Sequence, residues 1–276
     1  AGTTLAMTST ESHEQCESDA LDASASVATV VLVVATAEDL STEPGGAGQA
    51  GAPCAHDPCP ARTTRRAAYV GASDFYPDSA TPPLLDLIEH EIGHTLDLPH
   101  SGDPTVDQHS SALDVMSNSA APRDVQPQRR NAQDTIAINR LTLGWLPRSA
   151  VAAASQGGGA FDLEPSTGSA GLRLLVLPVD TDAFLTVEYL PRSGFDDFLP
   201  AGGIAVHLID QSPAACGHPT GSPCTGIDRA QTTLGSAIPH LDLLHVAQQS
   251  WSLDGWKITL DSIAAAARVD VSATGG

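Results

Sequence analysis

Positive charge is scarce in this sequence. Its 276 residues hold 13 Lys and Arg, with Lys257 the single lysine, against 33 Asp and Glu, which gives a formal net charge of −20. An acidic surface repels phosphates, so we expect neither nucleic acid nor an anionic membrane as a partner. Long apolar runs are absent too, because the longest, residues 27–35, falls far short of the roughly 20 residues that span a bilayer and predicts a buried strand. We expect a monomer without a membrane span.

Cysteines are few, and four of them stand in close pairs. Cys54 and Cys59 flank one short loop, and Cys216 and Cys224 flank another, while Cys16 is left over. Each loop also contains a histidine, but neither has the paired CxxC spacing of a structural zinc site. We therefore expect two local disulfides and an extracellular protein whose leader is not part of the sequence. Cys16 can pair outside the chain or remain a thiol.

Three histidines and a glutamate lie close together at residues 90–100, which read His-Glu-Ile-Gly-His-Thr-Leu-Asp-Leu-Pro-His. On a helix, His90 and His94 share one face, so two ring nitrogens can meet one metal ion. A turn after the helix would bring His100 back as third ligand and leave one coordination position open. Glu91, one step round the helix, would reach a water molecule in that position. The spacing predicts a catalytic zinc site.

Local sequence features predict a helix over residues 84–98. Thr81 can serve as N-cap, and Pro82 and Pro83 suit the first turn, where a missing N–H costs nothing. An apolar stripe at helical spacing lies beside the histidine face and consists of Leu84, Leu85, Ile88, Ile92 and Leu96. Pro99 ends the helix because it disfavours the α region at the residue before it.

The motif resembles the zinc signature of the metzincin peptidases, HExxHxxGxxH followed by a methionine turn. Residues 111–117, Ser-Ala-Leu-Asp-Val-Met-Ser, resemble that turn, and Met116 is one of only two methionines. The resemblance implies that Met116 lies beneath the zinc ligands and that Glu91 is the general base of peptide hydrolysis. Because metzincin domains combine a sheet with helices, it also implies an α/β (α+β) catalytic domain.

Two positions depart from the metzincin pattern. Asp97 stands where the family has the glycine of the turn, and aspartate tolerates the left-handed region better than most residues, so the turn can survive with modest strain. Alternatively, Asp97 supports a histidine ligand or takes the place of His100 at the metal. Ser117 and Asn118 follow Met116, so the tyrosine that assists catalysis in some metzincins has no counterpart.

The second half of the chain changes to short alternating or apolar runs separated by turns, which predicts an all-β sandwich. The expected strands are 172–179, 184–190, 203–209, 243–250, 256–261 and 267–271. Several of these segments, and a helix expected at 134–143, resemble immune-inhibitor-like and gametolysin-like secreted proteases. We therefore expect a peptidase domain at 1–148, poorly defined before residue 60, a small-residue linker at 149–160, and the sandwich at 161–276.

Two functions from different classes fit these features. The first is a secreted zinc endopeptidase, with one catalytic zinc ion and protein or peptide substrates. The second is a non-catalytic extracellular binding or adhesion protein with a structural or degenerate zinc site. Glu91 favours the peptidase, since a structural site needs no base beside an open position. Asp196 and Asp197 are candidate calcium ligands, as secreted proteases often use calcium. We interpret His207, His240 and His245 as ordinary strand or surface histidines.

Overall fold

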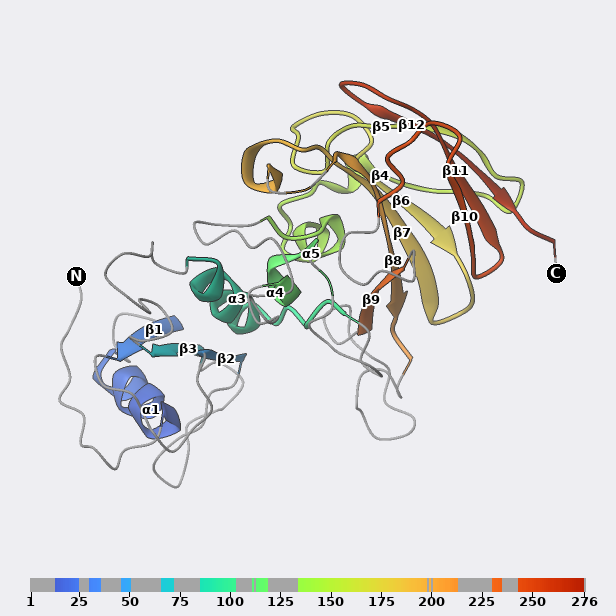
Figure 1. Ribbon diagram of the computed structural model, residues 1–276. Coiled ribbons are helices and arrows are strands. Elements are labelled where there is room, and N and C mark those ends of the chain that lie inside the picture. The colour runs from blue at the N-terminus through green and yellow to red at the C-terminus, as the bar shows by residue number, and fades with distance from the viewer. Residues whose placement is uncertain are drawn as a thin grey trace. The chain divides into compact units, whose positions relative to one another are not determined.

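The fold was analysed in a computed structural model (Figure 1). It describes residues 13–24, 30–35, 46–50, 66–71, 85–102, 111, 113–118, 134–197, 199, 201–212, 230–234 and 243–275. These residues form two compact units, one up to Leu98 and one from Pro99 onward. The four cysteines expected to form disulfides and the expected helix start at residues 81–84 lie outside the described residues.

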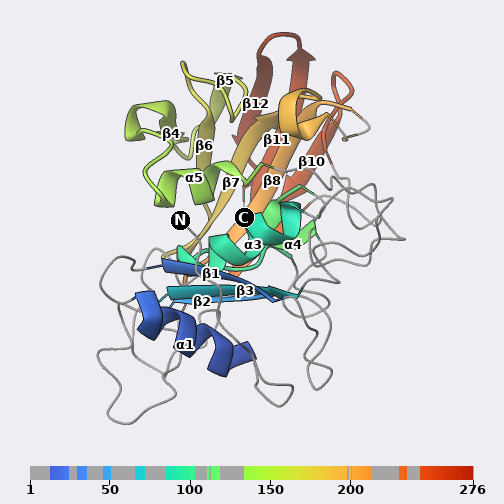
Figure 2. The same cartoon turned by 90° about the vertical axis from the view of Figure 1, so that its left-hand side faces the viewer.

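The first unit has three layers, with a small sheet between two helices. Its elements are α1 (His13–Ser24), β1 (Val30–Ala35), β2 (Gly46–Ala50), β3 (Arg66–Gly71) and α3 (Leu85–Thr95). The strand order is β1-β3-β2, with β1 parallel and β2 antiparallel to the central β3. Figures 1 and 2 show α1 on one face of this sheet and α3 on the other. Strand β3 alternates between the two helices: Tyr69 packs near Cys16 of α1, and Val70 packs on Leu87 of α3.

Two expectations for this unit were wrong. The helix α3 ends at Thr95, before Leu98, and it buries the face that carries Leu87, His90 and Glu91, while Leu85 and Ile92 of the apolar stripe are exposed. The packing of α3 onto β2 and β3 determines which face of the helix is buried, and the apolar stripe alone does not show this. Strand β1 is not buried either. It is an edge strand of the sheet, and its even-numbered side chains, including Leu32, are exposed.

The second unit is rich in β structure. Its short helices are α4 (Val115–Asn118) and α5 (Ala137–Thr142). One sheet has the order β4-β6-β7-β8-β9, formed by Val151–Ala153, Leu174–Pro178, Ala183–Leu190, Gly203–Asp210 and Ala230–Leu234. The other has the order β10-β11-β12-β5, formed by Ser250–Leu253, Trp256–Ile263, Ala267–Ala273 and Gly159–Leu163. The protein therefore combines an α+β part with a β-rich part, as the sequence predicts.

Both faces of the five-stranded sheet are covered. On one face, Leu185, Val206 and neighbouring residues share a hydrophobic core with residues of the four-stranded sheet such as Ile258 and Val269. On the other face, Ile138 of α5 and Leu146 pack against residues of β6 and β8. Figure 2 shows α5 beside β6 and β7. Strands β7 and β8 are consequently buried almost throughout their length.

The segments expected to be a linker and a strand differ from the sequence-based interpretation. Residues 149–160, expected as a linker, contain β4 and the start of β5, because β4 adds to the sheet by pairing with β6. Residues 243–249 have no regular structure apart from one turn and an isolated bridge from Leu244 to Ile204, and β10 begins only at Ser250. The assignment of residues 1–148 to a peptidase domain stays a prediction.

Candidate metal centre

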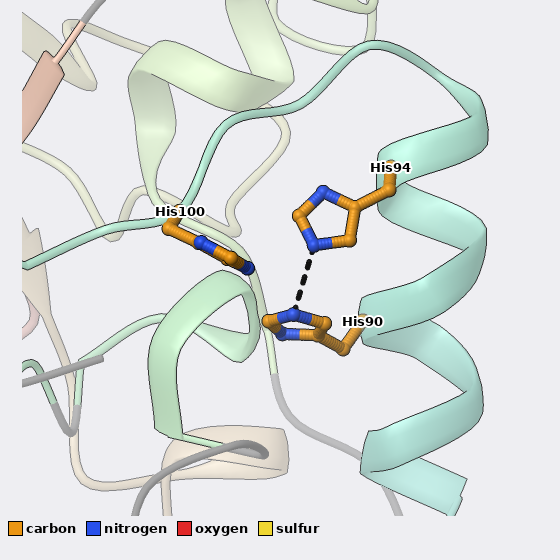
Figure 3. Close-up of side chains that lie close together, drawn as sticks. All are labelled: His90, His94 and His100. Atoms are coloured by element: carbon orange, nitrogen blue, oxygen red, sulfur yellow. Dashed lines mark hydrogen bonds between the residues drawn. The ribbon is translucent and has the colours of Figure 1, made fainter. Parts of the chain in front are cut away.

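Three imidazoles meet where the sequence predicts them. The ring nitrogens that His90, His94 and His100 offer lie within 4.8 Å of one another, and Figure 3 shows the rings turned toward a common point. The Nε2 atoms of His90 and His94 are 3.0 Å apart. Two nitrogen ligands of a tetrahedral zinc ion are separated by about 3.3 Å, given Zn–N distances near 2.05 Å. The spacing of His90 and His94 is therefore close to that of two ligands of one metal ion, and the three histidines form a group that could hold such an ion.

A tight turn after α3 carries the chain toward the third histidine. Asp97 N–H donates to the His94 carbonyl at 3.0 Å, and Leu98 N–H donates to the Gly93 carbonyl at 3.1 Å. This bond pair defines a Schellman motif, in which the residue after the helix takes a left-handed conformation and is usually glycine. Asp97 has φ 63°, so the expected positive-φ turn is observed. From this turn the chain needs only Leu98 and Pro99 to arrive at His100.

The turn also fixes one of the ligands. His94 Nδ1 donates a hydrogen bond to the Leu98 carbonyl at 2.9 Å, since a carbonyl oxygen can only accept. In a neutral ring this bond leaves Nε2 as the atom with a free lone pair, and Nε2 is the atom that faces His90. A backbone acceptor on the far nitrogen is the usual means of orienting a metal-ligating histidine.

Arg66, on the central strand β3, binds two residues of the same turn. Its guanidinium pairs with the Asp97 carboxylate at 2.8 Å and donates a second hydrogen bond to the Thr95 carbonyl. Thr95 is the last residue of α3, so its carbonyl lacks a partner within the helix, and a cation is favourable at this end of the helix dipole. Sequence reasoning missed Arg66, because nothing local links a strand residue to a turn that comes much later in the chain.

Glu91 is buried beside the two helical histidines. Its side chain comes from the inward face of α3, as expected for a residue one step round from His90. Burial, followed by the negative charge of Glu17, raises the pKa of Glu91 to about 8. A nearby dication would act in the opposite direction, since it favours the charged carboxylate. A carboxyl group whose pKa can be set near neutrality is suited to both accepting and donating a proton.

The predicted methionine turn lies against the segment that carries the third histidine. Ser101, which follows His100, donates its N–H to the Met116 carbonyl at 3.2 Å. Met116 is completely buried at the start of α4. The turn is closed by the Ser111 N–H, which donates to the Ser117 hydroxyl at 2.9 Å. The segment that carries Met116 and the segment that carries His100 are therefore neighbours in the structure.

Asp114 forms hydrogen bonds with the Met116 segment, with Ser101 and with residues 135 and 139. Its Oδ1 accepts from the Met116 N–H at 3.2 Å and from the Thr135 hydroxyl at 2.8 Å, and its Oδ2 accepts from the Asn139 amide at 3.1 Å and from the Ser101 hydroxyl. Burial raises the pKa of Asp114, and the hydrogen bonds from Ser101, Thr135 and Met116 oppose the rise. The sequence contained Asp114 within the methionine turn but gave no sign of this role.

A second buried carboxylate holds α5 on the sheet. Both oxygens of Glu188 on β7 accept from the N–H of Ala137, the first residue of α5, at 3.1 Å. A carboxylate is favourable at this end of a helix. Burial raises the pKa of Glu188 to about 7, while the Ala137 hydrogen bond acts in the opposite direction. Glu188 thus links the sheet to the helix whose Asn139 binds Asp114.

The other predicted residues that the structure describes do not join the histidine group. Asp196 is buried and Asp197 exposed, and among the described residues the histidine trio is the one group of three or more His, Cys, Asp or Glu that could hold a metal. His207 is a fully buried histidine of strand β8 and His245 is exposed, which agrees with their interpretation as strand or surface histidines. His240 lies outside the described residues. No helix in the described part of the chain is long and apolar enough to cross a membrane.

Comparison of the chain with family models, with curated proteins and with solved structures finds no match. The resemblance to metzincins therefore depends on the motif residues themselves. What the structure adds is the proximity of three histidines that could bind a metal ion, two of which belong to an HExxH-like motif.

Proposed function

We propose that this protein is a secreted zinc endopeptidase of the metzincin type, with His90, His94 and His100 as metal ligands. The observation that carries the proposal is the convergence of three ring nitrogens within 4.8 Å, with Glu91 buried on the same helix face. Three histidines with an open fourth position are a ligand set of catalytic zinc sites. A structural site would need four protein ligands, and the group found among the described residues consists of three histidines.

The chemistry of the proposed reaction is divided between the metal and Glu91. A zinc ion held by the three histidines would supply Lewis-acid chemistry, making a water molecule more acidic and stabilising negative charge that develops on a peptide carbonyl. Glu91 accepts the proton of the attacking water and afterwards delivers it to the leaving amine. Its burial favours the protonated form, which helps the first transfer, in which Glu91 accepts the proton.

The neighbouring residues keep this arrangement in place. The Leu98 carbonyl holds the His94 ring, and the Asp114 network connects the Met116 segment to Ser101, next to the third ligand. Preorganisation of this kind matters because small displacements of metal ligands reduce activity strongly. The proposal also includes calcium binding at Asp196 and Asp197 and secretion to an oxidising compartment, as the sequence predicts.

Digestion of casein, with and without a zinc chelator, tests the proposal directly. We expect cleavage that the chelator abolishes and added zinc restores. The Glu91→Gln variant should retain zinc and lose activity by at least about a hundredfold, since an amide cannot accept the proton. Glu164→Gln, which changes a half-buried glutamate of the β-rich part, is the matched control and should behave as wild type.

The non-catalytic alternative gives the opposite results. A chain that binds zinc but cleaves neither casein nor gelatin, at any zinc concentration, would support a binding protein with a structural metal. Cleavage that persists in Glu91→Gln would contradict the assignment of the base and leave the metal assignment standing.

A further inference from the structure

Asp97 is at a position where its backbone is strained. In the left-handed region a side chain lies too close to the following carbonyl, so every residue except glycine is destabilised there. With φ 63°, Asp97 bears that cost at the residue that closes α3. The left-handed conformation is needed because it places the Leu98 N–H on the Gly93 carbonyl and the Leu98 carbonyl on His94 Nδ1.

Arg66 offsets this strain with two contacts from one side chain. Its guanidinium pairs with the Asp97 carboxylate and donates a hydrogen bond to the Thr95 carbonyl, so it contacts the turn at two residues. Both partners of the ion pair are only 29% exposed, and the guanidinium is anchored on the first residue of β3, which pairs with strands on either side. Partial burial and a second hydrogen bond distinguish this pair from an isolated surface salt bridge.

We propose that Arg66 is a positioning residue of the metal centre: its bond to Asp97 stands in for the missing glycine and keeps the Leu98 carbonyl on His94. The inference rests on the proposed metal site. It predicts that Arg66 matters only while residue 97 carries a side chain, because glycine adopts the left-handed conformation without help.

Cobalt binding to the purified full-length chain tests the inference. Four proteins are compared: wild type, Arg66→Met, Asp97→Gly and the double variant, each by competition with a chelator and by the visible absorption spectrum of bound Co²⁺. Arg66→Met should weaken cobalt affinity about tenfold and alter the spectrum, as expected when the support of a ligand is lost. Asp97→Gly should leave both unchanged.

The double variant is decisive. In the Asp97→Gly background, Arg66→Met should change affinity by no more than about twofold, so that the two substitutions are strongly non-additive. Arg268→Met is the matched control, since Arg268 forms a more exposed ion pair with Asp162 at 2.9 Å in the β-rich part. It should bind cobalt as wild type does.

The outcomes separate this inference from the proposed function. Equal loss of affinity in both backgrounds, no loss in either, or failure of Arg66→Met to fold in both would show that Arg66 does not act through Asp97. If the two substitutions are non-additive in cobalt binding but the wild-type chain digests no protein, the positioning role is supported and the peptidase function is refuted. A wild-type chain that binds no cobalt would refute both.

Discussion

Acidification should destabilise the β-rich unit through His207. This histidine lies on β8, is fully buried, and has no hydrogen-bond partner for either ring nitrogen among the described residues. Burial lowers its pKa from 6.5 to about 4. The stability that depends on a neutral ring is therefore complete above pH 6.5 and is lost as the pH falls toward 4. At 1.36 kcal/mol per pKa unit, the loss amounts to about 3 kcal/mol, most of it by pH 4.5.

The variant His207→Leu removes the titrating group and two unpartnered polar atoms. At pH 7 it should be as stable as wild type or more stable, because a buried imidazole without partners gains nothing from its polarity. Urea unfolding followed by tryptophan fluorescence reports on the right unit, since Trp145, Trp251 and Trp256 all lie in it. Other groups also titrate, so the quantity to compare is the change between pH 7 and pH 4.5 in each protein.

Wild type should lose about 2.5 kcal/mol more than His207→Leu over this interval. The variant His245→Gln controls for the loss of an imidazole, because His245 is exposed in the same unit, and it should follow wild type. If wild type and His207→Leu lose equal stability, the ring is not kept neutral by burial and the reasoning fails.

Other predictions concern the carboxylates and the metal. Glu188, with its pKa raised to about 7, stabilises the fold fully below about pH 4.5, and this contribution is lost as the pH rises through 7. Glu188→Gln should therefore flatten the pH dependence of the free energy of unfolding in urea between pH 4.5 and 7. An unchanged slope would contradict the raised pKa. Asp114→Ala should lower the free energy of unfolding by about 3 kcal/mol, since several buried donors lose their acceptor, and a loss under about 1 kcal/mol would show the network to be dispensable. Metal analysis of His94→Ala should find zinc lost, and equal zinc content in variant and wild type would refute the ligand assignment.

The local parts of the site could be predicted from the sequence. His90 and His94 are four residues apart on a helix, and helical geometry alone places them together. The positive φ of Asp97 follows from the position that glycine holds in the motif. The neighbouring position of the Met116 segment came from resemblance, and the Ser101 hydrogen bond now gives it a physical basis.

Parts that depend on contacts distant in the chain could not be predicted. Arg66 belongs to a strand and Asp97 to a turn, and no periodicity connects them. His207 and Glu188 alternate with apolar residues, a pattern that normally marks a solvent-facing side of a sheet. Here α5 and the segment before it cover that side, so the same alternation places polar groups in a buried layer.

Residues before position 148 cover the second face of the five-stranded sheet, and this limits where the chain can be cut into separate domains. Leu113 packs with Leu190 and Ala205, and Ile138 and Leu146 pack with Ile209, so the segment before residue 148 contributes buried side chains to two hydrophobic clusters of the second unit. A polypeptide cut after residue 148 would expose these side chains to water and should aggregate. The β-rich part is therefore not an interchangeable module, and a chimaera that replaces it would have to replace the segment from residue 113 onward as well.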